Sequence, residues 1–181
     1  MKEVIAVVGK MASGKNYICS QFEKEGWHSI DADLLVHKAI EEAKDTILQT
    51  FSPYAQKAGI SITKQDGTID RRNLGVILFA NPELMAKQEA IVYPVITKML
   101  EDFIEKNDKV IINATVLYKT PALLEKCQKI YYIKAGFFTR LVRAKKRDSL
   151  PLRQILKRFY SQRKLFTEYK KTGRPIEIIK N

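Results

Sequence analysis

The sequence has 181 residues, of which 45% are hydrophobic and 29% are charged, and it carries a formal net charge of +12. This length predicts one domain with a real core. No apolar run approaches the ~20 residues of a membrane span, and the start of the chain lacks the pattern of a signal peptide. Cys19 and Cys127 are far apart and lack CxxC spacing, which argues against a disulfide framework and a zinc site. We therefore expect a cytoplasmic protein that does not act at a membrane.

The apolar patterns predict alternating strands and helices. In chain order they indicate a strand over 3–8, a loop over 9–14, a helix over 15–25, a strand over 28–33, a long helix over 34–51, turns over 59–67, helices over 71–79 and 83–106 with a break or kink at Pro94, strands over 109–114 and 129–134, basic helices over 137–147 and 152–171, and a last strand over 176–179. This order predicts an α/β fold, a parallel β-sheet flanked by helices with right-handed crossovers.

The loop after the first strand has the pattern of a phosphate-binding loop. Residues 9–16 read G-K-M-A-S-G-K-N and fit G-x-x-x-x-G-K, with Asn16 where the motif has Ser or Thr. Gly9 and Gly14 allow the tight turn that aims backbone N–H groups at phosphate oxygens, and the following helix adds its positive end. Lys15 would reach the β- and γ-phosphates. The competing interpretation is a chance Gly-Lys pair in a strand-to-helix turn, which the position after V-I-A-V-V disfavours.

Two carboxylates follow the second strand. Asp31 and Asp33 lie at the carboxyl end of a strand, the edge where open α/β sheets bind ligands. Asp33 could accept a proton from an attacking hydroxyl or hold a metal-bound water, or it could cap the next helix. For Asp31 a structural role and a functional role are equally open. His37 follows Asp33 by one helical turn, so a substrate contact is also open.

The C-terminal part of the chain is strongly basic. Fourteen Lys and Arg residues occur between Lys134 and Arg174, and only Asp148 and Glu168 oppose them. Some of these cations belong to a solvated helix face, and others could clamp phosphates. The total charge indicates polyanionic partners such as nucleotides.

Four segments of the chain resemble the dephospho-coenzyme A kinase family, a P-loop NTPase group. They are V-V-G-K-M-A-S-G-K at 7–15, I-D-A-D-L-L-V-H-K-A-I at 30–40, the series D-G-T-I-D-R-R-N-L at 66–74, F-A-N-P-E at 79–83 and E-A-I-V-Y-P-V-I at 89–96, and the basic stretch 143–148 with Arg158 and Gln162. Order and spacing agree over nearly the whole chain. The third segment is the distinctive one among small-molecule kinases.

The resemblance implies a single P-loop kinase domain over 1–181, with a helical substrate-binding region at 60–105 and a basic helical lid at 137–170. It implies ATP and dephospho-coenzyme A as substrates and Mg²⁺ as cofactor. We expect no nucleic-acid partner and a monomer, with an oligomer also open. The implied ATP-binding residues are Gly9, Lys10, Met11, Ala12, Ser13, Gly14, Lys15, Asn16, Arg140 and Arg147. The implied catalytic residues are Asp33 as base, Lys15 and Arg143. Asp31, Asp33, His37, Arg72 and Tyr93 are implied to bind the acceptor, and Asn16 and Asp33 the metal.

The chain departs from the family pattern at four places. Asn16 replaces the metal-binding hydroxyl, Tyr93 replaces a histidine, Asn113-Ala114-Thr115 stands where the family has Pro-Leu-Leu, and the sequence ends at Asn181 without the usual tail helix. These changes leave open a nucleotide-binding relative with little activity. A kinase for a different small acceptor is also open, and a nucleic-acid-binding protein is open but less favoured.

Overall fold

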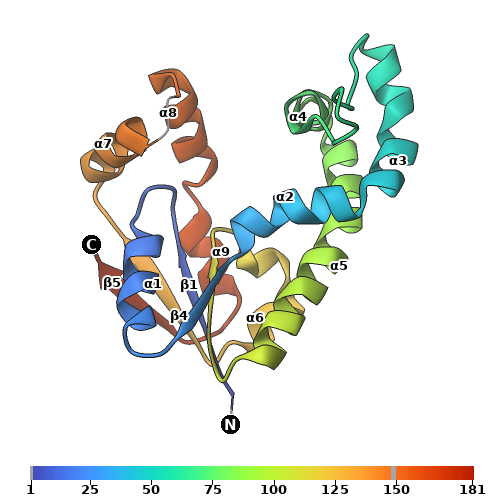
Figure 1. Ribbon diagram of the computed structural model, residues 1–181. Coiled ribbons are helices and arrows are strands. Elements are labelled where there is room, and N and C mark those ends of the chain that lie inside the picture. The colour runs from blue at the N-terminus through green and yellow to red at the C-terminus, as the bar shows by residue number, and fades with distance from the viewer. Residues whose placement is uncertain (1, 148–149) are drawn as a thin grey trace. The chain divides into compact units, whose positions relative to one another are not determined.

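The protein is described by a computed structural model that covers residues 2–147 and 150–181 (Figure 1). Asp148, one of the two acids within the basic part of the chain and the last residue of the family-like stretch, lies outside the described residues. The chain divides into two compact units. The sheet unit comprises the residues up to 33 and from 100 onward, and the helical unit comprises residues 34–99.

The sheet unit is built on five parallel strands in the order β2-β3-β1-β4-β5. The strands are β1 (Glu3–Gly9), β2 (His28–Asp31), β3 (Lys109–Ala114), β4 (Lys129–Lys134) and β5 (Ile176–Lys180). In β1, Ile5 pairs with Ile111 on one side and Lys129 on the other. The predicted parallel sheet is therefore confirmed, and each of its five strands overlaps a predicted strand.

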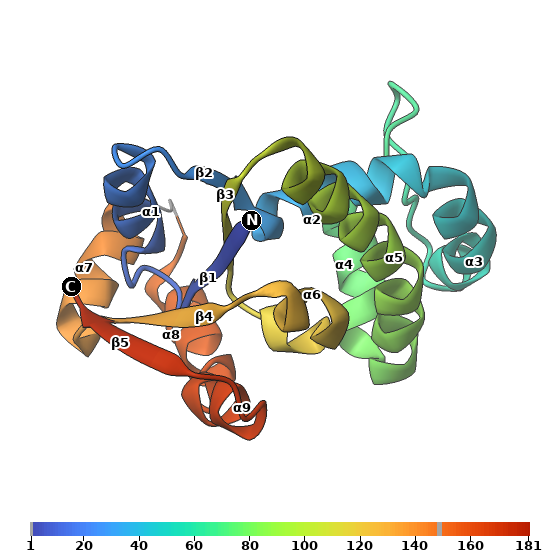
Figure 2. The same ribbon diagram turned by 90° about the horizontal axis from the view of Figure 1, so that it is seen from below.

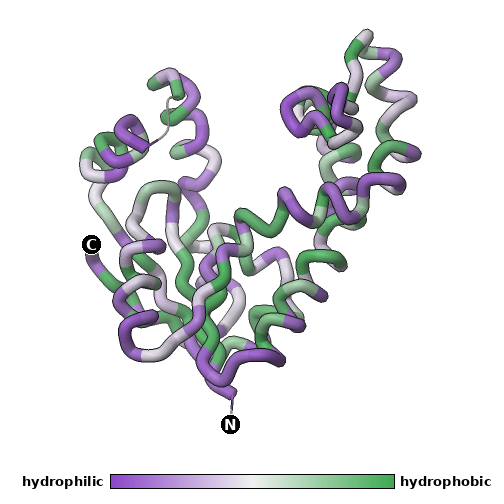
Figure 3. The backbone as a smooth tube through the Cα atoms, viewed as in Figure 1, coloured by the Kyte–Doolittle hydropathy of each residue, from purple (hydrophilic) through white to green (hydrophobic). Residues whose placement is uncertain are grey.

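Strand β1 lies at the centre of this sheet because its residues are apolar on both faces. Val4 to Gly9 are all buried, as expected for a strand that is covered by helices on two sides. Burial of each Val or Ile side chain contributes about 1.5–3 kcal/mol. The strands of the sheet are largely apolar along their length (Figure 3). The loop at the end of β1 is thereby fixed at the carboxyl edge of the sheet.

The two faces of the sheet are covered by different helices (Figure 2). Helix α1 (Lys15–Glu23) packs Ile18 and Phe22 against a buried cluster that includes Ile5 and Ile133. On the other face, the Tyr132 ring of β4 contacts Phe166 of α9 (Leu165–Lys171) with 4.8 Å between ring centroids. Successive residues of β4 thus pack on opposite faces, as the period of two in a strand requires.

The remaining helices are α2 (Ala32–Glu42), α3 (Lys44–Lys57), α4 (Arg71–Ala80), α5 (Pro82–Lys106), α6 (Pro121–Lys126), α7 (Phe137–Arg147) and α8 (Leu152–Ser161), with a short 3₁₀ turn at Leu117–Lys119. Helix α4 begins at a conventional cap, because Asp70 Oδ1 accepts the N–H groups of Arg72 and Asn73 at 3.0 and 3.1 Å. Within residues 2–147 and 150–181, no helix has both the length and the apolar character that a membrane crossing requires.

Two of the predicted long helices were wrong. The segment 34–51 is divided between α2 and α3, which are separated at Ala43. The segment 152–171 is divided between α8 and α9. There Gln162 lies in the break, and its Oε1 accepts the N–H of Met11 at 2.6 Å. The end of α8 thus coincides with a contact between Gln162 and Met11, which is far away in the sequence. The residue types at this position would have allowed the helix to continue.

Two smaller predictions also need correction. The predicted strand 28–33 ends at Asp31, because Asp31 Oδ1 accepts the Asp33 N–H at 3.0 Å and the chain enters α2 at Ala32. Pro94 does not break α5, which continues from Pro82 to Lys106, whereas the alternative of a kink there stays a prediction. The 3₁₀ turn and α6 were not predicted, since both are only three to six residues long.

Candidate functional site

The loop between β1 and α1 has the backbone conformation of a phosphate cradle. Ala12 and Gly14 have positive φ angles of 60° and 95°, so successive N–H groups turn toward one side. Gly14 suits its position because an L-residue at φ 95° is strained. Gly9 suits its position for space, because a Cβ there would lie 2.7 Å from the carbonyl oxygen of Ile133.

Side chains from distant parts of the chain hold this loop in place. The N–H of Met11 donates to Gln162 Oε1 at 2.6 Å, and its carbonyl accepts from Arg140 Nε at 2.8 Å. The carbonyl of Ser13 accepts from Arg143 Nη1 at 3.4 Å. Gln162, Arg140 and Arg143 thus bind two carbonyl oxygens and one N–H of the loop. The loop conformation is therefore stabilised by these distant side chains as well as by the residues of the loop itself.

A cavity of about 330 Å³ opens over the loop. Its lining residues are Ala12, Ser13, Gly14, Lys15, Asn16, Arg143, Lys146 and Arg147. The structure thus brings the loop of residues 9–16 together with the basic face of α7, over 125 residues later in the chain. Four of the lining residues are cationic and the N-terminus of α1 points at the same place, an arrangement that suits a polyphosphate.

Lys15 and Asp33 meet at the hydroxyl of Thr115. Lys15 Nζ donates to Thr115 Oγ1 at 3.2 Å and to the Gly9 carbonyl at 3.3 Å. Thr115 Oγ1 in turn donates to Asp33 Oδ2 at 2.7 Å, and the Thr115 N–H donates to Asp33 Oδ1 at 3.2 Å. Asp33 is the second residue of α2, and both oxygens of its carboxylate accept hydrogen bonds from Thr115. The expected cation and the expected base are therefore joined by one residue.

Burial lowers the pKa of Lys15, while the carboxylates of Asp33 and Asp31 raise it and Arg147 lowers it further. The ammonium group is thus taken out of water beside two carboxylates that favour its charged form. A phosphate group in the cavity would act in the same direction as these carboxylates.

Asn16, one of the two expected metal-binding residues, contacts Asn113 of β3. Asn113 Nδ2 donates to Asn16 Oδ1 at 2.9 Å. The Oδ1 of Asn113 is buried and has no hydrogen-bond partner, and buried acceptors are rarely left so. Among the described residues, no three His, Cys, Asp or Glu side chains gather closely enough to hold a metal by themselves. The available donors are oxygens of Asn16 and Asp33, which fit Mg²⁺, an ion that binds few protein ligands and keeps its waters.

Arg140 does not line this cavity. It is buried, with 6% of its surface exposed, and its guanidinium lies 4.0 Å from the centre of the Phe159 ring. Burial lowers its pKa, and the nearby Tyr132 raises it. Of the three arginines expected at the nucleotide, the structure places Arg143 and Arg147 at the loop's cavity and Arg140 behind the loop.

The helical unit contains a separate cavity of about 350 Å³. It is lined by residues of α2, α4 and α5: Val36, His37, Ile40, Arg71, Leu74, Gly75, Leu78, Phe79, Met85, Gln88, Glu89, Val92 and Tyr93. Two of the expected acceptor-binding residues, His37 and Tyr93, lie in its wall, whereas Arg72 does not and its neighbour Arg71 does. Partial burial, and then the charge of Arg71, lower the pKa of His37.

Sequence reasoning missed several residues of these sites. Thr115 was noticed only as part of a departure from the family, although its place directly after β3 at the carboxyl edge of the sheet was a usable signal. Tyr169 donates to the Thr115 carbonyl at 3.0 Å and accepts the Leu117 N–H at 2.9 Å. No local pattern marks that role, because the contact spans over fifty residues.

Comparisons with known proteins agree with this geometry. The model of the protein family described as dephospho-CoA kinase matches residues 3–181. A dephospho-CoA kinase from Treponema denticola is 36% identical over 98% of this chain and 82% of its own length. The solved structure of a dephospho-CoA kinase from Campylobacter jejuni is 27% identical, with a TM-score of 0.63 over 99% of this chain and 88% of that chain.

A further solved structure, of TT1252 from Thermus thermophilus, shares the fold with a TM-score of 0.79 at 21% identity, over 99% of this chain and 88% of that chain. A family match across nearly the whole sequence, a phosphate loop after β1 and a carboxylate joined to the loop lysine agree with one another. The chain belongs to the dephospho-CoA kinase family.

Proposed function

We propose that this protein transfers the γ-phosphoryl group of ATP to the 3′-hydroxyl of dephospho-CoA, giving CoA and ADP. The observation that carries the proposal is the joining of Lys15 and Asp33 through Thr115 at the edge of the phosphate loop. A cation for the phosphates and a base for the acceptor are thereby held a fixed distance apart. Family membership supplies the acceptor, and this joined pair argues for a working enzyme over a relative that only binds nucleotide.

In this proposal the loop residues Gly9 to Asn16 bind the triphosphate through backbone N–H groups, and Lys15 neutralises the charge that develops on the transferring group. Arg143 and Arg147, which line the same cavity, contact the phosphates from α7. Arginine suits this work because its planar fork can meet two oxygens at once. Phosphoryl transfer asks mainly for alignment and positive charge.

Asp33 is the proposed base. It accepts the proton of the 3′-hydroxyl as the bond between that oxygen and the γ-phosphorus forms and the bond to the β-phosphate oxygen breaks. Thr115 orients the carboxylate by donating to both of its oxygens. Mg²⁺, with Asn16 and Asp33 as proposed ligands, would when bound draw negative charge from the phosphate oxygens.

The acceptor is proposed to bind in the cavity of the helical unit. His37, Arg71 and Tyr93 lie in its wall and offer polar contacts, while its leucines and valines offer apolar surface. This assignment keeps the predicted substrate-binding region 60–105 and adds α2 to it. Residues 137–170 remain the proposed lid.

Turnover by the Asp33→Asn variant tests this assignment. We expect kcat to fall by a factor of about a hundred or more, since general-base catalysis contributes roughly 10²–10⁴-fold, with ATP affinity nearly unchanged. ADP release is measured with and without dephospho-CoA, and ATP binding by titration calorimetry. Asp102→Asn, an exposed acid of α5, is the matched control. Near-normal turnover of Asp33→Asn would show that another group is the base.

A panel of acceptors decides the substrate. ADP release that depends on dephospho-CoA supports the proposal, whereas release with another alcohol and none with dephospho-CoA would assign a different acceptor. The monomeric state and the cytoplasmic location stay predictions from the sequence; sedimentation of the purified protein tests the first, and fractionation of the source cells the second.

A further inference from the structure

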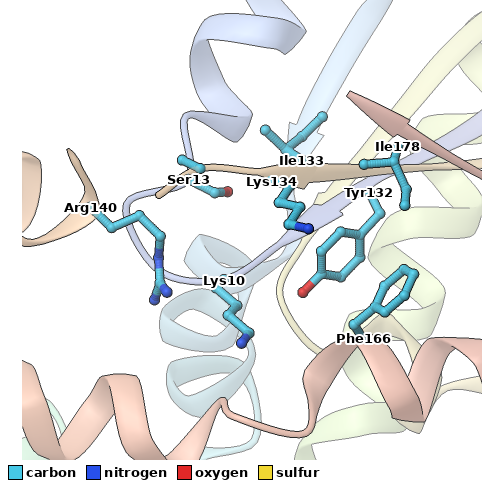
Figure 4. Close-up of a pocket in the computed structure, with 9 residues that line it drawn as sticks. Lys10, Ser13, Tyr132, Ile133, Lys134, Arg140, Phe166 and Ile178 are labelled. Carbon is cyan, nitrogen blue, oxygen red and sulfur yellow. The ribbon is translucent and has the colours of Figure 1, made fainter. Parts of the chain in front are cut away.

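A second cavity lies behind the phosphate loop, at the carboxyl end of β4 (Figure 4). Its volume is about 270 Å³. Its wall consists of Lys10, Ser13, Tyr132, Ile133, Lys134, Ala135, Arg140, Phe166 and Ile178. Apart from Ser13, this wall shares no residue with the cavity over the loop.

The two cavities differ in the elements that build them. The cavity over the loop has the first residues of α1 in its wall, with Gly14 and Lys15. The second cavity has Tyr132 and Phe166, which pack together on the face of the sheet that α9 covers. A triphosphate in the cradle of the loop would therefore leave this second space available.

The wall of the second cavity carries positive charge without a counter-charge. Lys10, Lys134 and Arg140 all line it, and no Asp or Glu is among its described lining residues. Burial lowers the pKa of Lys10, and the charges of Arg140 and Lys134 lower it further. Three cations that repel one another around one space form a site that favours an anion.

The same wall holds buried polar atoms that have no partner. The Tyr132 hydroxyl, Arg140 Nη2 and Ser13 Oγ are buried and make no hydrogen bond, and the three residues are only 4%, 6% and 1% exposed. A buried polar group without a partner costs about 1–3 kcal/mol. Figure 4 shows Lys134 and Tyr132 on one side of this space and Arg140 on the other, with Lys10 between them.

We propose that this second cavity binds a small phosphate-class oxyanion that is not part of ATP. Arg140 and the two lysines supply charge, and the Tyr132 and Ser13 hydroxyls supply further donors to a tetrahedral group. Ordered water could satisfy the hydroxyls, but water does not neutralise three cations. Phe166 and Ile178 form an apolar side of the wall, which restricts the size of the occupant.

The occupant would also stabilise the phosphate loop. Arg140 Nε already holds the Met11 carbonyl at 2.8 Å, and Lys10 Nζ reaches the Arg163 carbonyl at 3.4 Å. An anion between these two cations would remove their repulsion and leave both contacts in place. Binding to the folded state alone raises the melting temperature as occupancy increases.

Thermal unfolding with inorganic phosphate as the probe tests the proposal. The phosphate loop itself could bind phosphate, so the measurements are made in the full chain carrying Lys15→Ala, which removes one cation from that site and weakens its phosphate binding. Ionic strength is held constant with chloride. We expect phosphate to raise the melting temperature of Lys15→Ala, and the dissociation constant to be read from that rise.

Second substitutions in the same background locate the site. Tyr132→Phe removes only an unpartnered hydroxyl and Lys134→Gln removes one charge, and each should weaken phosphate binding about tenfold, the loss expected for one hydrogen bond to a charged group. Lys145→Gln, an exposed lysine of α7 outside the cavity wall, is the charge-matched control and should bind like its parent.

Two results would overturn the proposal. The first is that phosphate no longer raises the melting temperature once Lys15→Ala has been introduced. The second is that, in the Lys15→Ala background, Tyr132→Phe and Lys134→Gln bind phosphate as tightly as the Lys145→Gln control. Phenyl phosphate in parallel distinguishes the sources of the anion. Tighter binding than inorganic phosphate indicates a phosphate ester, and weaker binding indicates free phosphate. None of these measurements uses turnover, so the proposed kinase activity and this site can fail independently.

Discussion

Thr115 contacts both side chains on which the proposed chemistry depends. Its hydroxyl accepts from Lys15 and donates to Asp33, and its N–H donates to the same carboxylate. We expect Thr115→Val to lower kcat about tenfold to a hundredfold, because the carboxylate loses a hydrogen bond to a charged group worth about 1.5–3 kcal/mol. The effect should fall on kcat more than on the KM for ATP.

Thr115→Ser keeps the hydroxyl and is the control, with kcat expected within a few-fold of the unmodified protein. The separate measurement of kcat and KM distinguishes the roles. If both variants lose activity equally, the hydroxyl alone is not sufficient, and the complete Thr115 side chain is needed to position Asp33.

The reactivity of the two cysteine thiols, Cys19 and Cys127, tests whether these residues are buried. Burial raises the pKa of Cys19 and of Cys127 to about 12 each, and their surfaces are 2% and 1% exposed. At pH 8 both thiols therefore stay protonated in the folded protein, and the thiolate is the reactive form. We expect a disulfide reagent to label neither thiol until denaturant is added, and then to label both. Rapid labelling of two thiols in the folded protein would contradict this burial.

At the scale of elements, Tyr169 ties α9 to the segment that follows β3. Its hydroxyl accepts the Leu117 N–H and donates to the Thr115 carbonyl, and its ring is fully buried. We expect Tyr169→Phe to lower the free energy of unfolding by about 1–3 kcal/mol, because a buried N–H and a partly buried carbonyl lose their partner. Urea unfolding measures the loss.

Tyr118→Phe is the matched control, since the Tyr118 ring contacts Tyr169 edge to face at 5.4 Å but holds none of these backbone groups. Its unfolding free energy should stay within about 0.5 kcal/mol of the parent. Equal stability of Tyr169→Phe and the parent would mean that water replaces the hydroxyl at no cost.

Some strands and helix boundaries could be predicted from the sequence, and others could not. Strands β1, β3 and β4 are predictable because each is a continuous β-branched or aromatic run between polar residues. The division between α2 and α3 is not, since Ala43 favours helix and nothing in the residue type marks a boundary. The break at Gln162 has a reason that lies elsewhere in the chain, namely the Met11 N–H that Gln162 binds.

The same distinction applies to the site. A motif with fixed spacing predicted the phosphate loop, and a strand end predicted the carboxylates, because both patterns are local. The positions of Thr115, Arg140 and Arg71 depend on which segments the fold brings together. A family resemblance could assign Arg140 to the nucleotide by its position in a basic helix, but only the packing of α7 shows that its guanidinium turns toward Met11 and Phe159.

For the molecule as a whole, the division into a sheet unit and a helical unit predicts separate effects of the two substrates. We expect ATP to slow hydrogen exchange in residues 10–16 and in α7, because residues 12–16 and three residues of α7 line the cavity over the loop. Dephospho-CoA should slow exchange in α2, α4 and the part of α5 before residue 99, which line the cavity of the helical unit. Mass spectrometry of the exchanged peptides measures both.

The control ligand for this experiment is AMP, which lacks the β- and γ-phosphates and should protect residues 10–16 less than ATP does. Protection by dephospho-CoA confined to the sheet unit would contradict the placement of the acceptor in residues 34–99 and would require a new acceptor site.

The Thr115 hydroxyl has a single hydrogen, and its acceptor Asp33 must return to its starting state after each turnover. This hydrogen points at Asp33 while Lys15 occupies the other side of the oxygen, so both contacts fix the orientation of the hydroxyl. With Asp33 as the proposed base, the carboxylate carries the acceptor's proton at the end of each phosphoryl transfer. Since the carboxylate is exposed, it can release that proton straight to solvent, and the enzyme returns to its starting state without a chain of further side chains.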